Sequence, residues 1–427
     1  MSENVVREIS SAMLEEKYYC IDHKSGLRIY VYPKEGYSSS FAVFGTNYGS
    51  IDTCFKLDTD EAATSIPEGT AHFLEHKLFE SEDLDAFERF AKTGASANAY
   101  TSFDKTGYLF SCSTNFIPSL EILLDFVQSP YFTKETVEKE QGIIGQEIRM
   151  YDDVPDWKVL FNMLGAMYHS HPVKIDIAGT QESISRITDK VLYKCYNTFY
   201  NLYNMVLCVA GNVSVDEVLD AADRLLKPAE KQKVQRIFPA EPDSIVESSV
   251  TEKMSVAVPV FCLGYKEKMT SEEVPLADRI KMSVLLEILA GNTSELYQSM
   301  LTQGIINTNF GFEHFTGGGY SAVIFSGESS KPEKVREMVE SQLKKLRSEG
   351  ISEECFERSR KMLYGKAVMG YNSVEGVANA MMASHFMGVS LFDELDIYKK
   401  LTVRDIEEVL HSSMDAEKSV LSVILPA

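Results

Sequence analysis

The residues best suited to do chemistry are two histidines and a glutamate in the run His72-Phe73-Leu74-Glu75-His76. On a helix, residues four positions apart lie on one face about one turn apart, so both imidazoles can point at a single metal ion. At about 100° per residue, Glu75 falls within the same third of the helix circumference and can reach a water beside that ion. A hydrolytic zinc site uses three protein ligands and keeps one position open for water. The run therefore predicts two zinc ligands and a general base, and one ligand is still to be found.

A second pair of acidic residues, Glu140 and Glu147, can supply that ligand. They are seven residues apart, which is two helical turns, so both project from one face of a helix. Placed against the histidine helix, one carboxylate completes a site of two histidines and a glutamate, and the other can orient a ligand. Such Glu-x6-Glu pairs are common on solvated helix faces, whereas His-x-x-Glu-His, the inverzincin signature, arises by chance in roughly one chain of this size in a hundred. The histidine run therefore carries the prediction.

The elements that must position these residues follow from hydrophobic periodicity. Apolar residues at helical spacing predict a helix over 70–80 with Thr70 as a candidate N-cap, and a helix over 133–150 capped by Thr133. Runs rich in β-branched and aromatic residues predict strands. The remaining elements predicted are strands at 27–33, 40–45, 108–112, 205–210, 256–264 and 320–325, and helices at 117–127, 215–226, 276–289 and 332–346.

The second half of the chain repeats the first in element order. Residues 352–369 match residues 133–150 best, which sets Glu140 against Ser359 and Glu147 against Lys366. A polar stretch with three prolines separates the halves. We therefore predict an N-terminal metal-binding domain over 1–227, a linker over 228–254 and a degenerate homologous domain over 255–427. The predicted fold class is α+β: two homologous halves of mixed, largely antiparallel sheets with packed helices, forming a clamshell around a cavity.

Composition narrows the class of protein. With 427 residues the chain exceeds what one hydrophobic core usually supports. A net charge of -21 argues against nucleic acid or an anionic membrane as the main partner. The N-terminus lacks the pattern of a secretion signal, and no apolar run reaches membrane-spanning length. The seven cysteines are scattered, without the spacing of a zinc or redox site, so reduced thiols in a cytoplasmic protein are expected.

These residues resemble the pitrilysin/insulinase family of zinc peptidases, which includes mitochondrial processing peptidase. His72-x-x-Glu75-His76 followed by Glu140-x6-Glu147 is similar to the metal signature of that family, and residues 94–101 (GASANAYT) resemble its Asn-Ala strand. The similarity spans nearly the whole chain and is greatest to a short bacterial branch with one ligand-bearing and one degenerate half.

The resemblance implies a role for each residue. His72, His76 and Glu147 would hold Zn²⁺, Glu75 would act as the base, and Glu140 would orient a ligand. Asn98 and Ala99 would lie on an edge strand that binds an extended peptide by main-chain pairing. The implied activity is that of a zinc-dependent endopeptidase acting on peptides or flexible precursor segments in an enclosed chamber.

The resemblance also implies a partner. Active members usually carry an Arg-x6-Tyr pair in the degenerate half, but Leu301 and Asn307 stand at those positions here. Losing such donors typically costs about 10²- to 10³-fold in rate each. A homologous second subunit that supplies the Arg/Tyr pair is therefore expected, although a homodimer or a monomer using other donors is the alternative. A catalytically idle peptide-binding or scaffold subunit of the same family is the other function class.

Two further motifs are expected to be structural. His169-x-His171 has metal-ligand residue types, but its neighbours predict a loop. The run Gly317-Gly318-Gly319 lacks the strand-loop-helix setting and the Lys-Ser/Thr of a phosphate-binding loop, so a turn is expected.

Overall fold

The computed structural model describes residues 3–82, 84–269 and 271–427. The chain divides into two compact units, each assembled from three segments. Unit 1 comprises Met1–Gln146, Asp176–Ile237 and Val368–Phe392, and unit 2 comprises Glu147–Ile175, Phe238–Ala367 and Asp393–Ala427. No helix among the described residues is both long enough and apolar enough to cross a membrane.

Unit 1 is built on a mixed sheet, with a small antiparallel sheet beside it. The strands are β1 (Val5–Ser11), β2 (Glu16–Asp22), β3 (Arg28–Pro33), β4 (Ser40–Thr46), β5 (Cys54–Leu57), β6 (Thr64–Ser65), β7 (Ser96–Thr101), β8 (Thr106–Cys112), β9 (Met205–Gly211) and β10 (Val234–Arg236). The helices that begin in unit 1 are α1 (Thr70–Leu78), α2 (Ala86–Thr93), α3 (Phe116–Phe126), α4 (Lys134–Asp152), α6 (Gln181–Ile184), α7 (Asp189–Phe199), the 3-10 turn η2 (Leu202–Asn204), α8 (Val215–Leu225) and α13 (Val374–Met387).

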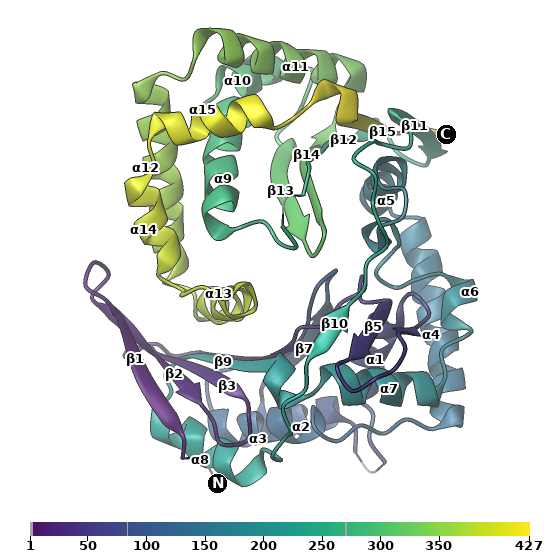
Figure 1. The fold of residues 1–427 in the computed structure, drawn as a ribbon, viewed down its shortest axis with the longest axis vertical. Helices are drawn as coiled ribbons and strands as arrows, with labels where there is room; N and C mark the ends of the chain where they lie inside the picture. Colours follow the sequence, from purple (N-terminus) through teal and green to yellow (C-terminus); the bar gives the residue numbers. More distant parts are fainter. Residues whose placement is uncertain (1–2, 83, 270) are drawn as a thin grey trace. The chain divides into compact units, whose positions relative to one another are not determined.

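In the described part of unit 1, the main sheet has the order β1-β2-β3-β9-β4-β8-β7. β3 and β9 are parallel, and the other neighbours are antiparallel. The central strands β4 and β9 are buried along their whole length. Both faces are covered, because α3 and α8 pack on one side of the sheet and α13 packs on the other (Figure 1). The small sheet has the order β10-β5-β6.

The sheet described in unit 2 is covered by helices on both faces. Its strands are β11 (Ser249–Met254), β12 (Val260–Lys266), β13 (Gly311–Gly317), β14 (Tyr320–Glu328) and β15 (Ser419–Pro426). The helices that begin in unit 2 are α5 (Pro155–Met167), η1 (Pro172–Lys174), α9 (Leu276–Ala290), α10 (Glu295–Thr302), α11 (Pro332–Glu349), α12 (Glu353–Gly370), α14 (Asp393–Lys400), α15 (Val403–Ser412) and η3 (Ala416–Lys418).

The alternation of side chains along β12 shows how this sheet is covered. Phe261, Leu263 and Tyr265 belong to the core that the sheet shares with α9, α11 and α15. α5 packs on β11, β12 and β15 (Figure 1). A side chain at Gly264 would clash with the sulfur of Met163 on α5. Successive residues of a strand point to opposite faces, so both faces of β12 are buried.

The two sheets share a topology. The order β3-β9-β4-β8-β7 in unit 1 corresponds to β11-β15-β12-β14-β13 in unit 2. In both, the first pair is parallel and the others are antiparallel. The predicted α+β fold class is confirmed, and the common topology supports the internal repeat read from the sequence.

Each half of the chain contributes one helix to the compact unit built mainly from the other half. α5 follows α4 in the chain and covers the sheet of unit 2, whereas α13 follows α12 and covers the sheet of unit 1. The compact units are therefore not the contiguous stretches 1–227 and 255–427. The division into homologous halves at these bounds stays a prediction. The predicted linker, 228–254, contains β10, which pairs with β5, and β11, which pairs with β15.

Candidate metal centre

The histidine helix α1 is oriented by its apolar face. Phe73, Leu74 and Leu78 are buried to 1% exposure or less, which fixes the side of the helix that turns away from the core. His72, Glu75 and His76 remain half-buried. α1 packs against β7 and β8. Local hydrophobic packing therefore presents all three polar side chains of the predicted motif on the accessible side of the helix.

The start of α1 differs from the prediction that Thr70 caps it. Gly69 is the N-cap, with φ 82°, and the hydroxyl of Thr70 donates to the carbonyl of Pro67. A side chain at Gly69 would meet the carbonyl oxygen of Ala178, and its positive φ already disfavours other residues. The contact with a distant loop, which local sequence cannot reveal, therefore selects the cap.

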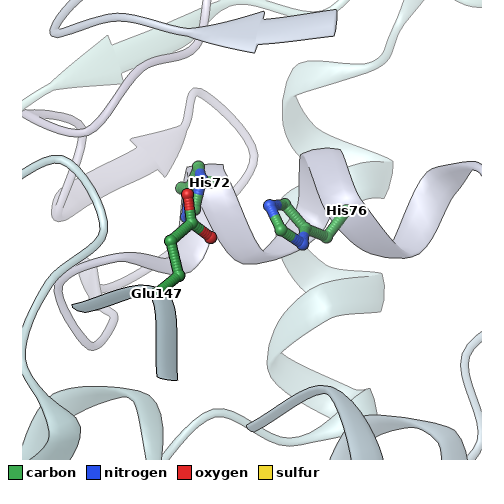
Figure 2. Close-up of side chains that lie close together, drawn as sticks. All are labelled: His72, His76 and Glu147. Carbon is green, nitrogen blue, oxygen red and sulfur yellow. The ribbon is translucent and has the colours of Figure 1, made fainter. Parts of the chain in front are cut away.

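His72, His76 and Glu147 come together as predicted. One donor atom from each lies within 4.8 Å of the others, and the two imidazole rings have centroids 4.6 Å apart. Figure 2 shows the Glu147 carboxylate turned toward the face of α1 that carries both rings. Zinc at about 2.0–2.2 Å from each donor requires separations of roughly 3.4 Å. Two imidazoles and one carboxylate, all half-buried, fit a catalytic zinc ion after small side-chain adjustments.

α4 supplies both acidic residues from one face. The helix is continuous from Lys134 to Asp152, so Glu140 and Glu147 lie two turns apart on the same side. Glu140 Oε1 lies 3.0 Å from Nδ1 of His76, and its side chain is only 13% exposed. An ionised carboxylate accepts only, so Nδ1 donates and the lone pair of the neutral ring lies on Nε2, the atom that can bind a metal ion. Glu140 is thus placed to fix the ring orientation and tautomer of His76.

The environment of His72 favours the form that binds metal. Burial, and then the neighbouring His76, lower the pKa of His72 to about 3. Its imidazole is therefore neutral at physiological pH, and a neutral imidazole is the ligand form.

Glu75 has a partner that the sequence pattern did not indicate. The hydroxyl of Thr101, at the end of β7, donates to Oε2 of Glu75 at 2.6 Å. Thr101 belongs to the GASANAYT segment, but no spacing rule connects it to a residue 26 positions away. The sequence predicted only that the strand containing Thr101 lies near the site, not that Thr101 contacts Glu75.

β7 lies at the free edge of the unit 1 sheet, as predicted for Asn98 and Ala99. The bond from Ser102 N to Lys105 O marks a hydrogen-bonded pair, and such pairs alternate along an antiparallel ladder. Ala99, opposite Tyr108, is therefore in a non-bonded pair whose main-chain groups point to the free edge, whereas those of Asn98 point to β8. Asn98 Oδ1 accepts from the Ala99 N–H at 2.9 Å, so the side chain of Asn98 covers the edge group that Ala99 offers.

The remaining motifs have structural partners. Leu301 packs against the core of unit 2, and Asn307 donates to Glu328, so neither side chain resembles a carbonyl-binding Arg or Tyr. His171 is buried and its Nε2 bonds to the carbonyl of Gly318, while His169 Nε2 contacts Ser244. Gly318 and Gly319 form the two-residue turn of the β13–β14 hairpin, in agreement with the predicted turn.

Comparison with known proteins agrees with this geometry. Residues 62–181 match the domain described as "Insulinase (Peptidase family M16)", and residues 186–363 match the "Peptidase M16 inactive domain". An uncharacterized zinc protease, YmfH, of Bacillus subtilis is 39% identical over 99% of this chain and 100% of its own length.

Solved structures give the same result. The crystal structure of a putative M16-like peptidase from Alicyclobacillus acidocaldarius is 33% identical, with a TM-score of 0.90 over 100% of this chain and 99% of that one. A protease from Helicobacter pylori shares the fold at 20% identity and a TM-score of 0.83, covering 96% of this chain and 100% of that one. The chain belongs to the insulinase family, peptidase family M16, as the sequence resemblance predicted.

Proposed function

We propose that this chain is a zinc-dependent endopeptidase. The observation that carries the proposal is the convergence of His72, His76 and Glu147, with Glu75 on the same face of α1. Its relatives are named zinc proteases, which supports the choice of metal. Zinc held there would act as a Lewis acid toward water and toward the carbonyl of the scissile bond.

The chain's own residues would then perform the proton transfers and hold the substrate. Glu75 accepts a proton from the attacking water and delivers it to the departing amine. Glu140 keeps His76 in the ligand orientation. The free edge of β7 pairs with an extended peptide backbone through Ala99, and Asn98 releases the Ala99 N–H when the peptide binds. Backbone pairing selects extended or flexible segments, and the enclosed chamber implied by the family resemblance would exclude folded proteins.

The site is tested by metal analysis joined to a fluorogenic peptide assay. Wild type should bind one zinc per chain, and changing His72, His76 or Glu147 to Ala should abolish tight binding because two protein ligands remain. Glu75→Gln should retain zinc but lose turnover by about 10²- to 10⁴-fold, since the base is gone while the ligands stay. A zinc-free wild type after gentle purification, or full activity in Glu75→Gln, would contradict the assignment.

We further propose that full activity needs a homologous partner that supplies an Arg/Tyr pair. The supporting observations are Leu301 in a core contact and Asn307 bonded to Glu328, together with the match of residues 186–363 to the inactive domain. The assay is run on the lone chain and after mixing with candidate partner chains that lack the zinc motif. A large gain on mixing supports the heterodimer, and strong turnover by the lone chain that does not change on mixing excludes it.

A second candidate function, an idle peptide-binding or scaffold subunit, rests on the same inactive-domain match. It predicts bound zinc and peptide binding without turnover in any mixture. For cellular location, the seven cysteines are all free, which supports the proposal of a reducing cytoplasmic environment.

A further inference from the structure

We infer that Thr101 is a positioning residue for the general base, an inference that rests on the proposed peptidase function. Its hydroxyl donates to Oε2 of Glu75 at 2.6 Å. This length falls in the range of charge-assisted O–H···O⁻ bonds, which are roughly twice as strong as neutral ones. An ionised carboxylate can only accept, so the direction of the bond is fixed. The bond therefore fixes one carboxylate oxygen of the proposed general base.

The hydroxyl of Thr101 is itself held in place. Thr is β-branched, so its χ1 angle is restricted, and the adjacent Ser102–Lys105 backbone bond of 2.8 Å fixes the end of the strand. Thr106 lies opposite, with its Oγ1 3.4 Å from that of Thr101. Thr106 is fully buried and donates its hydrogen to the carbonyl of Tyr48 at 2.9 Å. Thr106 has no hydrogen left to donate to Thr101, and the hydrogen of Thr101 goes to Glu75, so the contact between the two hydroxyl oxygens is a packing contact only.

The strand register gives Thr101 a second connection to the site. Thr101 and Thr106 form a non-bonded pair, so the main-chain groups of Thr101 face the free edge, as those of Ala99 do. Side chains at alternate positions share a face, and the others on this face are the small Ala97 and Ala99. One residue thus holds the base through its side chain and lies on the edge proposed to bind the peptide backbone. Thr101 links the position of the substrate to the orientation of Glu75.

The test compares Thr101→Val, which keeps the shape but removes the hydroxyl, with Thr101→Ser, which keeps the hydroxyl. Thr251→Val, on the exposed face of β11, is the matched control for the same chemical change. Zinc per chain, kcat and KM on a fluorogenic peptide are measured for the protein with any partner it needs. We expect Thr101→Val to lower kcat about 10- to 100-fold, with zinc content and KM within about twofold of wild type. Thr101→Ser should recover most of the rate, and Thr251→Val should match wild type.

A merely structural role would lower zinc content, or would change KM and kcat together, and would not be rescued by Ser. Wild-type kcat in Thr101→Val overturns the inference while leaving the peptidase proposal intact. Crystal structures of Thr101→Val and Thr101→Ser supply a readout that needs no activity. If the wild type hydrolyses no peptide, the peptidase proposal fails alone. A Glu75 carboxylate that turns away only in Thr101→Val then still supports the positioning contact, and an unmoved carboxylate overturns it.

Discussion

At the scale of single residues, neighbouring groups set the protonation state of His72 and the orientation of His76 in the candidate metal centre. Burial keeps His72 neutral, and Glu140 orders His76 by accepting from Nδ1. Both effects prepare nitrogen lone pairs for a cation without changing the ligands themselves. Substituting a residue beside the candidate ligands should therefore weaken metal binding only partly, whereas removing a ligand should abolish tight binding.

Glu140→Gln tests this graded effect. The neutral amide can still accept from His76, but it no longer stabilises charge on the ring. We expect zinc affinity or kcat to fall about 10- to 100-fold. The measurement is zinc competition with a chelator, together with peptide kinetics. Glu138→Gln, an exposed position on the same helix, is the control. Zinc retention and kinetics equal to wild type in Glu140→Gln would demote Glu140 to a residue without a role in the site.

At the scale of elements, α13 and α5 each pack on a sheet through a methionine that contacts a strand glycine. Met382 of α13 lies against Gly45 of β4, and Met163 of α5 lies against Gly264 of β12. A flexible thioether fills the space that a missing side chain leaves on the sheet. The same device occurs in both units, as expected if the contact predates the divergence of the two halves.

Gly264→Ala should destabilise the protein by about 1 kcal/mol, because the added methyl group would force the buried but flexible side chains of Met163 and Met167 to shift. Gly365→Ala on α12 is the matched control, since a methyl group there meets no atom within 4 Å. It should stabilise by about 0.5–1 kcal/mol through helix propensity. Free energies of unfolding from denaturant titration decide the outcome. Equal effects of the two substitutions would show that α5 does not pack tightly on β12.

At the scale of the whole chain, the segment between the predicted domains is anchored by buried ion pairs. Arg236 of β10 binds Asp52 of unit 1, which is 2% exposed. Five residues later, Glu241 binds Lys266 of unit 2 and accepts from the backbone N–H groups of His169, Ser170 and His171. The middle of the predicted linker therefore makes one ion pair with each unit, through Arg236 and through Glu241.

Glu241 should make stability depend on pH. Burial alone would raise its pKa, but Lys266 and the three N–H groups outweigh burial and lower the pKa to about 2. Because the folded pKa lies below the ordinary value of 4.5, the stabilisation is complete above pH 4.5 and is lost as the pH falls toward 2. Unfolding free energies measured between pH 7 and pH 3 should decline more steeply in wild type than in Glu241→Gln.

At pH 7, the free energy of unfolding of Glu241→Gln should be about 3 kcal/mol lower than that of wild type, because Lys266 is left buried without a charged partner. Glu247→Gln, at an exposed position of the same segment, should behave as wild type. If the free energy of unfolding falls equally with pH in wild type and Glu241→Gln, Glu241 is not the cause of the acid sensitivity.

The sequence by itself was enough to predict which residues form the candidate metal site and where most of the helices and strands lie. Helices and strands depend on residues three to seven positions apart or on alternation along a strand, so a short stretch of sequence is enough to reveal them. α1, predicted over 70–80, runs from Thr70 to Leu78, and α4, predicted over 133–150, runs from Lys134 to Asp152. Even the pairing of Glu147 with the histidines followed once the family resemblance joined the two helices.

Only the tertiary structure decided which distant segments meet. The bond from Thr101 to Glu75, the cap at Gly69 and the edge-facing register of Ala99 each depend on a partner brought close by folding. The exchange of α5 and α13 and the strands inside the predicted linker were likewise invisible to periodicity. A hydrophobic pattern specifies that a face is buried but not against what, because the same apolar side chains gain similar free energy from any well-packed partner. The choice of partner comes from shape, and shape exists only in the folded chain.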